Sequence, residues 1–377
     1  MMLNRTDQQD MTYRGFEQGP IRPPSEAYSL LVRVTRNCPW NRCTFCPVYK
    51  GAAFSVRPLA HVLLDLDAIY EAVQKLRQQG PGPAAITGDR GAWMAARNWV
   101  RNGCRQVFLQ DANSLVVPPA HLKTILQHLK VRFPEVTRVT SYARSNSIAN
   151  LDAGDLAGQR EAGLNRIHIG MESGADPVLK MVHKGTTKRM HILAGRKVKD
   201  AGMELSEYYM PGLGGRRCLE INALETAAAL NAINPDFIRL RTLAIPPGTP
   251  LFDDYDAGRF DKATDLEMAR ELLLFLEALT GITSTVRSDH ILNLLPEVDG
   301  QLPQDRERLI GVVRAFLSLD PELQFLYRVG RRTGFLSGLR DLDDIDKISQ
   351  VEAICQRYNI TSDTVDAVTD EMMRRFI

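Results

Sequence analysis

Three cysteines are the residues of this chain whose type and spacing most directly suggest chemistry. Cys38, Cys43 and Cys46 form a C-x4-C-x2-C run, just after an apolar stretch at residues 28–34 that predicts a β-strand. Three thiolates on one loop can hold an iron–sulfur cluster that keeps one iron open, as a three-ligand zinc site keeps an open position. The run therefore predicts a metal centre that can also bind a substrate or cosubstrate.

Other interpretations of the three cysteines remain open at this point. Buried thiols are one, although the polar Asn41 and Arg42 between them favour an exposed loop. A zinc site is another, and it would need a fourth ligand nearby. Plant-type ferredoxins also begin with this spacing and add a later fourth cysteine, but the next cysteine here, Cys104, lies beyond a predicted helix.

The segments after the first strand alternate between apolar strands and amphipathic helices. Strands are expected at residues 30–35, 106–110, 136–142, 166–171, 203–210 and 237–242. Four of the intervening helices are expected to end at a glycine, at Gly80, Gly103, Gly163 and Gly202. Such alternation favours a parallel sheet with helical crossovers.

The predicted fold class is α/β, a partial (β/α)6 TIM-like barrel with a helical C-terminal extension. We expect an N-terminal lead segment at residues 1–27, the core barrel at 28–250 and a mainly helical extension at 251–377. A chain of 377 residues has room for one large domain and such an extension.

Polar residues follow most of the predicted strands. In a parallel αβ barrel the active site lies at the carboxyl ends of the strands. The groups that follow the second to sixth strands are Asp111 and Asn113, then Arg144, then Glu172, then the glycine-rich residues 211–215, then Arg241. Polar groups at the carboxyl ends of several strands suit a cofactor pocket to which all of these strands contribute.

The cysteine loop resembles the cluster-binding loop of radical S-adenosylmethionine (radical SAM) enzymes. Those enzymes usually show C-x3-C-x-aromatic-C, and Phe45 matches the aromatic residue before the last cysteine. The first gap is one residue longer here, as in a subgroup with a C-P-aromatic-N-R-C-x-F-C loop. The Gly-Met-Glu-Ser-Gly stretch at 170–174, His-Lys-Gly at 183–185 and Ser-Asp-His at 288–290 also resemble that subgroup. The resemblance covers roughly residues 20–310.

The resemblance implies two cofactors. Cys38, Cys43 and Cys46 would hold a [4Fe–4S] cluster, and its open iron would bind the amino and carboxylate groups of S-adenosylmethionine. An electron from the cluster would split the sulfonium, giving methionine and a 5′-deoxyadenosyl radical that takes a hydrogen atom from a substrate. The cofactors supply this chemistry and the protein positions them.

The resemblance also implies which side chains lie at the cofactors: Phe45, Asp111, Asn113, Arg144 and Glu172. Asp111 stands where the family often has a Gly-Gly-Glu motif that contacts the methionine amino group. Glu172 fits a contact to the ribose or the methionyl group. Arg144 can pair with the cosubstrate carboxylate, since guanidinium binds carboxylate bidentately.

We therefore expect a radical SAM enzyme that acts on an unknown small molecule or peptide. The alternative is a non-enzymatic iron–sulfur electron carrier or scaffold, and a zinc-stabilised binding module is a third interpretation. Under the first interpretation, an electron donor such as flavodoxin or ferredoxin is expected as a partner.

Composition narrows the classes of partner and compartment. The net charge is +2, which gives no electrostatic case for nucleic acid or an anionic membrane. No apolar run approaches the length of a membrane span, and the polar N-terminus does not read as a signal peptide. Six cysteines are too few for a disulfide scaffold in a chain of this length, so we expect a reducing cytoplasm.

Overall fold

The computed structural model describes residues 12–79, 86 and 88–375, and these form two compact units. Of the described residues, the first unit takes 12–41, 48–79, 86, 88–169 and 196–205, and the second takes 42–47, 170–195 and 206–375. The cysteine loop is thus divided, because Cys38 belongs to the first unit and Cys43 and Cys46 belong to the second.

The strands form one sheet of eight and a separate pair. The large sheet has the order β1-β4-β5-β6-β7-β8-β9-β10, and the pair is β2-β3. The strands are β1 Leu30–Arg33, β2 Thr35–Arg36, β3 Ser55–Val56, β4 Gln106–Gln110, β5 Arg138–Ala143, β6 Leu164–Glu172, β7 Glu204–Tyr209, β8 Phe237–Leu240, β9 Thr285–Arg287 and β10 Gly300–Gln301.

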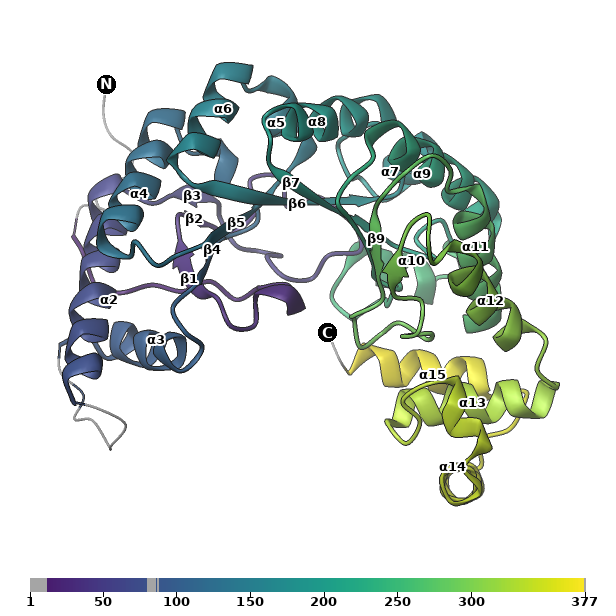
Figure 1. Cartoon of the computed structure of the whole chain (residues 1–377). Coiled ribbons are helices and arrows are strands. Elements are labelled where there is room, and N and C mark those ends of the chain that lie inside the picture. The colour runs from purple at the N-terminus through teal and green to yellow at the C-terminus, as the bar shows by residue number, and fades with distance from the viewer. Residues whose placement is uncertain (1–11, 80–85, 87, 376–377) are drawn as a thin grey trace. The chain divides into compact units, whose positions relative to one another are not determined.

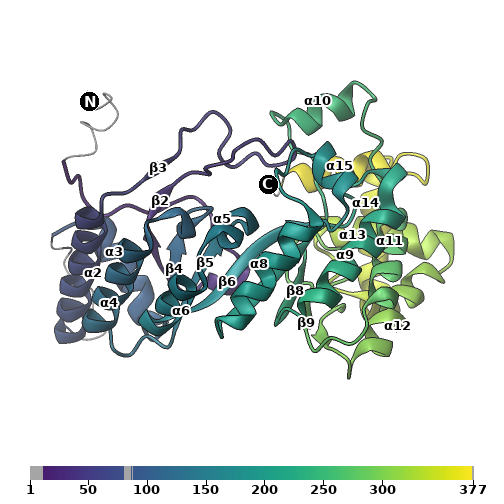
Figure 2. The same cartoon turned by 90° about the horizontal axis from the view of Figure 1, so that it is seen from above.

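In the first unit the strands of the large sheet are parallel and covered by helices, whereas the short pair β2-β3 is antiparallel. The strand β1 pairs with β4, β4 with β5 and β5 with β6, all parallel. Figure 1 shows helices beside these strands, and Figure 2 shows the same elements from above. The helices are α2 Leu59–Gln79, α3 Arg90–Arg101, α4 Pro119–Arg132, α5 Ser145–Asn150 and α6 Ala153–Ala162, with short 3-10 turns η1 Pro24–Glu26 and η2 Ser114–Val116. Val107, Leu109 and Leu126 are among the apolar side chains buried there.

The second unit continues the parallel pattern and adds most of the later helices. The strand β7 pairs with β8 and β8 with β9 in parallel, whereas β10 pairs with β9 antiparallel. The helices are α7 Asp176–Met181, α8 Lys188–Asp200, α9 Leu219–Ile233, α10 Pro250–Asp256, α11 Asp265–Ala278, α12 Arg306–Leu317, α13 Pro321–Thr333, α14 Ile345–Arg357 and α15 Val365–Arg374, with 3-10 turns η3 Arg216–Cys218 and η4 Leu339–Asp343. The strands β6 and β7 and the helix α8 have residues in both units.

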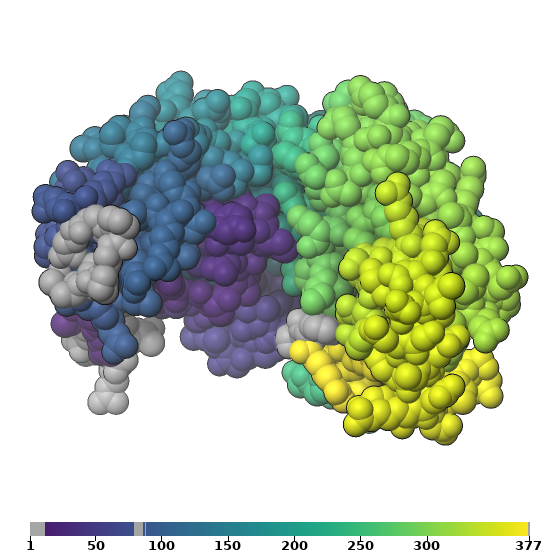
Figure 3. Space-filling model, turned by 60° about the horizontal axis from the view of Figure 1, so that its bottom comes forward, coloured from purple at the N-terminus to yellow at the C-terminus, as the bar shows by residue number. Residues whose placement is uncertain are grey.

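A buried ion cluster ties the C-terminal helices to the start of α11. Asp265 accepts from Arg332 at 2.6 Å and lies 3.3 Å from Arg328, both on α13. Burial raises the pKa of Asp265, but the two guanidinium groups outweigh it and hold the pKa at about 2. Figure 3 shows in yellow the surface that these C-terminal helices present. Removing one partner of a buried ion pair is strongly destabilising, because the other charge is left buried and unpaired. This cluster therefore fixes α13 on α11.

The predicted class, α/β with a parallel sheet and a helical C-terminal part, is confirmed. Each of the six predicted strands is present, with ends shifted by two residues at most and with 106–110 matched at both ends. The sheet also continues into β9 and β10, which are too short to give a sequence period. The predicted boundaries at residues 27 and 250 stay predictions, and part of the first segment, 1–11, lies outside the described residues.

Three of the predicted helix-ending glycines have the expected conformation. Gly103, Gly163 and Gly202 all have positive φ, and Gly163 caps α6 with φ 119°. A side chain would strain the backbone at such a position, so glycine ends the helix and lets the next strand start. The fourth, Gly80, lies outside the described residues.

Candidate active site

The first part of the cysteine loop is a tight turn. Cys38 follows β2, and Asn37 and Asn41 on either side of it have φ of 66° and 45°. The backbone N–H of Asn41 donates to the sulfur of Cys38 at 3.4 Å, and its side-chain amide donates to the carbonyl of Tyr49 at 2.5 Å. Asparagine tolerates the left-handed conformation, so these two residues shape the loop around the thiol.

Asp111 lies beneath the start of this loop. Its carboxylate is fully buried, and Oδ2 accepts from Arg33 Nε at 2.8 Å and Nη2 at 2.6 Å. The same oxygen accepts from the backbone N–H of Asn37 at 3.0 Å, one residue before Cys38. Burial raises the pKa of the Tyr49 phenol, and the charge of Asp111 adds to that. Asp111 therefore orients the backbone that leads into the first cysteine.

Asn113 and Arg144 form a second contact set in the first unit. The amide of Asn113 accepts from the backbone N–H of Arg144 at 3.2 Å and donates to Ser147 at 2.7 Å. The guanidinium of Arg144 lies 5.2 Å from the ring centroid of Trp40, which stands between the first two cysteines. Such a cation–π contact brings a fixed positive charge to the loop. Asn113 uses its amide to position Arg144.

The second part of the cysteine loop is held by backbone hydrogen bonds in the second unit. Thr44 donates from its N–H to the carbonyl of Val182 at 3.0 Å and accepts from the N–H of Leu251 at 3.0 Å. Phe45 is buried, and the ammonium of Lys184 lies 5.8 Å from its ring centroid. Residues that follow α7 and the first turn of α10 therefore fix the loop beside Cys43 and Cys46.

Glu172 and Lys184 make an ion pair at the carboxyl end of β6. The ammonium Nζ and the carboxylate Oε1 are 3.0 Å apart, and both side chains are largely buried. Glu172 has φ 65°, which turns the chain as the strand ends. A Cβ at Gly170 would lie 2.3 Å from Oε1 of Glu172 and 3.2 Å from Nζ of Lys184. A side chain at 170 would displace the carboxylate of Glu172, so the glycine leaves room for the ion pair in this position.

Glu207 on β7 is a buried acid. It is fully buried, and neither carboxyl oxygen has a hydrogen-bond partner among the described residues. Burial raises the pKa of Glu207 well above its usual range, the charge of Glu172 adds to this, and Lys184 opposes it. A neutral carboxyl group is the form expected there at pH 7, and it can donate a hydrogen bond.

A second buried carboxyl group holds the glycine-rich turn that follows β7. Glu271 on α11 accepts from the N–H of Gly212 at 2.7 Å, from the hydroxyl of Tyr209 at 2.7 Å and from the amide of Asn222 at 2.6 Å. Burial raises the pKa of Glu271 to about 7, although these three hydrogen bonds lower it. Gly212 has φ 85°, and a Cβ would lie 2.6 Å from the sulfur of Met268. The turn is therefore fixed by α11.

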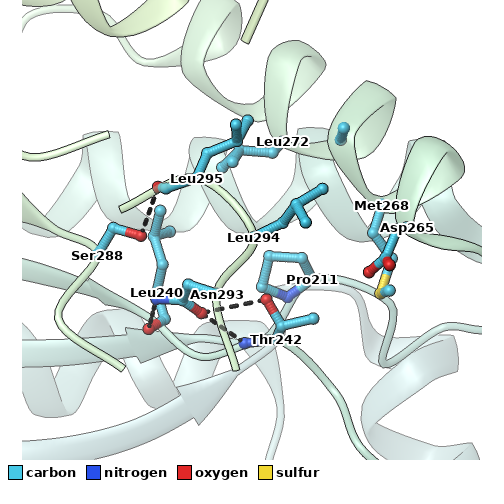
Figure 4. Close-up of a pocket in the computed structure, with 11 residues that line it drawn as sticks. Pro211, Leu240, Thr242, Asp265, Met268, Leu272, Ser288, Asn293, Leu294 and Leu295 are labelled. Carbon is cyan, nitrogen blue, oxygen red and sulfur yellow. Dashed lines mark hydrogen bonds between the residues drawn. The ribbon is translucent and has the colours of Figure 1, made fainter. Parts of the chain in front are cut away.

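A small cavity of about 30 Å³ lies behind this turn (Figure 4). Asn293 spans its floor, accepting from the N–H of Thr242 at 3.0 Å and donating to the carbonyl of Leu240 at 2.9 Å. Ser288 donates to the carbonyl of Leu295 at 2.8 Å. The volume suits one or two water molecules, so the cavity is a packing feature and not a substrate pocket.

The three cysteines of the loop suit a soft metal centre by their chemistry. None of the three takes part in a disulfide bond, and neither do Cys104, Cys218 and Cys355. Across residues 12–79, 86 and 88–375, no three His, Cys, Asp or Glu side chains already stand together as a metal site. Iron–sulfur clusters are held by cysteine sulfurs and are tuned by hydrogen bonds to those sulfurs. The sulfur of Cys38 already accepts one such bond, from Asn41.

The comparison with protein families is decisive for the core of the chain. Residues 32–217 match the model of the Radical SAM superfamily. These residues form a radical SAM domain. The radical SAM domain expected from the cysteine loop is thereby confirmed, and the superfamily uses a [4Fe–4S] cluster and S-adenosylmethionine. The subgroup with the longer first gap is not tested by this match.

Two curated relatives are similar over much of the chain. A tRNA-2-methylthio-N(6)-dimethylallyladenosine synthase of Prosthecochloris aestuarii is 25% identical over 283 residues, covering 74% of this chain and 55% of the relative. A tRNA uridine(34) acetyltransferase of Methanocaldococcus infernus is 24% identical over 305 residues, with coverage of 74% and 55%. The chain therefore spans about half the length of these relatives.

Similar solved structures come from the same superfamily. Coproporphyrinogen III oxidase (HemN) of Escherichia coli has a TM-score of 0.44 and 14% identity, covering 73% of this chain and 56% of that one. TsrM of Kitasatospora setae, a radical S-adenosylmethionine methyltransferase, has a TM-score of 0.40 and 17% identity, with coverage of 59% and 36%. Likeness at this level carries no argument about the activity of this chain. Among the described residues, no helix has the length and apolar character needed to cross a membrane.

The polar residues that follow the predicted strands include some of the residues of this site and not others. Glu172 and Arg144 are among them, but the buried Glu207, in the middle of β7, and Glu271, on α11, are not. Lys184 was quoted only as part of a resembling tripeptide. The positive φ of Glu172 gave no signal in the sequence, since glutamate rarely adopts that conformation.

Proposed function

We propose that this chain is a radical SAM enzyme of the subgroup with a C-P-W-N-R-C-T-F-C loop. The observation that carries the proposal is the set of three cysteines at 38, 43 and 46, outside any disulfide bond, inside a domain that matches the superfamily model. When bound, the cluster supplies the electron that cleaves S-adenosylmethionine, and the resulting 5′-deoxyadenosyl radical takes a hydrogen atom from the substrate.

Cys38, Cys43 and Cys46 are the proposed ligands of the [4Fe–4S] cluster. Asp111 supports the first of them by holding the N–H of Asn37 at 3.0 Å. The backbone of Thr44 supports the other two through residues 182 and 251, and Phe45 is buried beside Lys184. In this assignment Asp111 acts on the loop, in addition to the contact with the methionine amino group that the resemblance implies.

The proposed cosubstrate contacts are Phe45, Asp111, Asn113, Arg144 and Glu172. The assignment of Glu172 is supported by the space that Gly170 leaves for its carboxylate and by its ion pair with Lys184, which orients that carboxylate. Arg144 offers a fixed guanidinium, and Asn113 positions its backbone. Glu207 adds a neutral hydrogen-bond donor that the sequence argument did not name. These groups bind and orient the cosubstrate, and their burial excludes water.

The proposed reductant is a protein such as flavodoxin or ferredoxin, and the proposed compartment is the cytoplasm, where free thiols stay reduced. The substrate is a small molecule or a peptide. The net charge of +2 gives no basis for proposing nucleic acid, although the curated relatives carry tRNA in their names.

Electron paramagnetic resonance tests this proposal against the electron-carrier alternative. The protein is reconstituted anaerobically with iron and sulfide, reduced with dithionite, and measured with and without S-adenosylmethionine. Direct binding of the cosubstrate to an open iron should change the signal of the reduced cluster. An unchanged signal at saturating cosubstrate would favour an electron carrier or scaffold, and a colourless protein with stoichiometric zinc would favour the zinc-stabilised module.

A further inference from the structure

The carboxyl ends of β8 and β9 form a second polar site in the second unit. The two strands are parallel, and their register pairs Arg239 with Arg287. Continuing that register two residues further places Arg241 beside Asp289, with His290 next in the chain. Ligands of parallel sheets bind at the carboxyl ends of strands, so this is a position where side chains meet a ligand.

Asp289 is already committed to another arginine. Arg239 is buried, and its guanidinium donates to Asp289 through Nη1 and to the hydroxyl of Ser206 through Nε at 3.1 Å. A buried guanidinium needs such a partner because an unpaired buried charge is strongly destabilising. The carboxylate of Asp289 therefore neutralises Arg239.

Arg241 carries a guanidinium that the rest of the described chain does not use. Its backbone N–H donates to the carbonyl of Tyr209 at 2.9 Å, but its side chain has no hydrogen bond or ion pair with any described residue. The residue is exposed, and it follows directly after β8. By contrast Arg287, at the matching end of β9, is paired with Asp299 at 2.7 Å. Arg241 is the strand-end arginine that remains available for a ligand.

His290 faces Arg241 as a neutral hydrogen-bond donor. Its Nδ1 accepts from the N–H of Leu292 at 3.3 Å, so the ring proton lies on Nε2. Burial and, to a lesser degree, the charge of Arg241 lower the pKa of His290, whereas the charge of Asp289 raises it. The net pKa is about 4. The ring therefore stays uncharged at pH 7 and offers an N–H.

The remaining charges around this segment are accounted for by other contacts. Arg332 on α13 donates to the carbonyl of Leu292 at 2.6 Å and is neutralised by Asp265. Arg331 donates to the carbonyls of residues 293, 294 and 336. Among these described arginines, Arg241 is the one whose guanidinium has neither a hydrogen bond nor an ion pair.

We propose that Arg241 and His290 form an oxyanion-binding subsite that holds a carboxylate or phosphate group of the substrate. A planar guanidinium binds either group bidentately, and the imidazole N–H supplies a further donor without adding charge. The assignment of the bound group to the substrate rests on the radical chemistry proposed above, whereas the anion site itself does not.

Equilibrium dialysis of the full-length chain, without added S-adenosylmethionine, tests the site. The probes are radiolabelled inorganic phosphate and acetate at pH 7 and constant ionic strength. We expect saturable binding of at least one probe, at least tenfold weaker in Arg241→Gln and weakened in His290→Leu, with His290→Gln closer to wild type because it keeps a donor. Arg287→Gln, a strand-end arginine that has its own partner, is the matched control and should bind like wild type.

A site-specific readout keeps the test independent of folding. In protein labelled with ¹⁵N-histidine, the His290 imidazole signal, assigned with His290→Gln, should shift in a saturable way with the bound probe and stop shifting in Arg241→Gln. Saturation by phosphate alone assigns a phosphate-bearing substrate, and saturation by acetate alone assigns a carboxylate. Equal binding by wild type and Arg241→Gln, or no saturable binding of either probe, overturns the subsite and leaves the radical SAM assignment untouched.

Discussion

The guanidinium of Arg33 on β1 donates hydrogen bonds to the carboxylate of Asp111, which follows β4. The atoms Nη2 and Oδ2 are 2.6 Å apart, and the carboxylate is fully buried. The same carboxylate oxygen accepts the N–H of Asn37, which directly precedes Cys38. Two neighbouring strands therefore fix the entry of the cysteine loop through one acid. This relationship gives the loop a rigid base on which thiols can be presented.

Asp111→Asn should lower both stability and iron retention. The amide would present N–H groups or a weaker acceptor to Arg33, and breaking a buried ion pair costs about 3–5 kcal/mol. Urea unfolding measures the first effect, and iron content after desalting measures the second. Asp67→Asn is the control, because Asp67 pairs with Arg132 where both side chains are about one-third exposed. Such an exposed pair contributes about 1 kcal/mol or less. Equal losses in the two variants would remove Asp111 from this role.

Each cysteine of the loop should be required for the cluster. Cys38→Ala, Cys43→Ala and Cys46→Ala should each abolish the brown colour and the absorbance near 400 nm that [4Fe–4S] proteins show, at about four irons per chain in the wild type. The matched controls are Cys104→Ala, Cys218→Ala and Cys355→Ala, which remove free thiols elsewhere. Iron uptake that survives loss of a loop cysteine, or that fails in a control variant, would contradict the ligand assignment.

Glu172→Gln should weaken S-adenosylmethionine binding and leave the cluster in place. The change removes the charge that Lys184 holds at 3.0 Å, and loss of one charged hydrogen bond lowers affinity roughly tenfold or more. Equilibrium binding to the reconstituted protein measures it. Glu225→Gln, which breaks a partly exposed Glu–Lys pair elsewhere, should bind like wild type. If both variants match wild type, Glu172 is not a cosubstrate contact.

Glu271 should make stability depend on pH. Burial raises the folded-state pKa of this acid to about 7, above its unfolded value, so the folded state binds the proton more tightly. Its contribution is then complete below about pH 4.5 and is lost as the pH rises through about 7, a change of roughly 2–3 kcal/mol. Urea unfolding at several pH values should show this fall in wild type.

Glu271→Gln should flatten that dependence, because an amide does not titrate. Glu277→Gln, on the same helix and partly exposed, should keep the slope of the wild type. A Glu271→Gln variant with the full wild-type slope would mean that another group is responsible.

The sequence was sufficient for the local features and not for the long-range ones. The strands could be predicted because glycines such as Gly163 end the helices before them, and the cysteine loop because its three ligands lie close together in the chain. The contact of Glu271 with Gly212 spans 59 residues, and that of Arg33 with Asp111 spans 78. Periodicity does not encode such pairs, since any acid on a helix can face any turn until the fold brings them together.

Product analysis of S-adenosylmethionine cleavage tests the central assignment most directly. The reconstituted protein, reduced with dithionite under anaerobic conditions, should convert S-adenosylmethionine slowly to 5′-deoxyadenosine and methionine in equal amounts, and Cys46→Ala should not. Absence of 5′-deoxyadenosine from a protein with an intact, reduced [4Fe–4S] cluster, while a known radical SAM enzyme is active under the same conditions, would contradict the account.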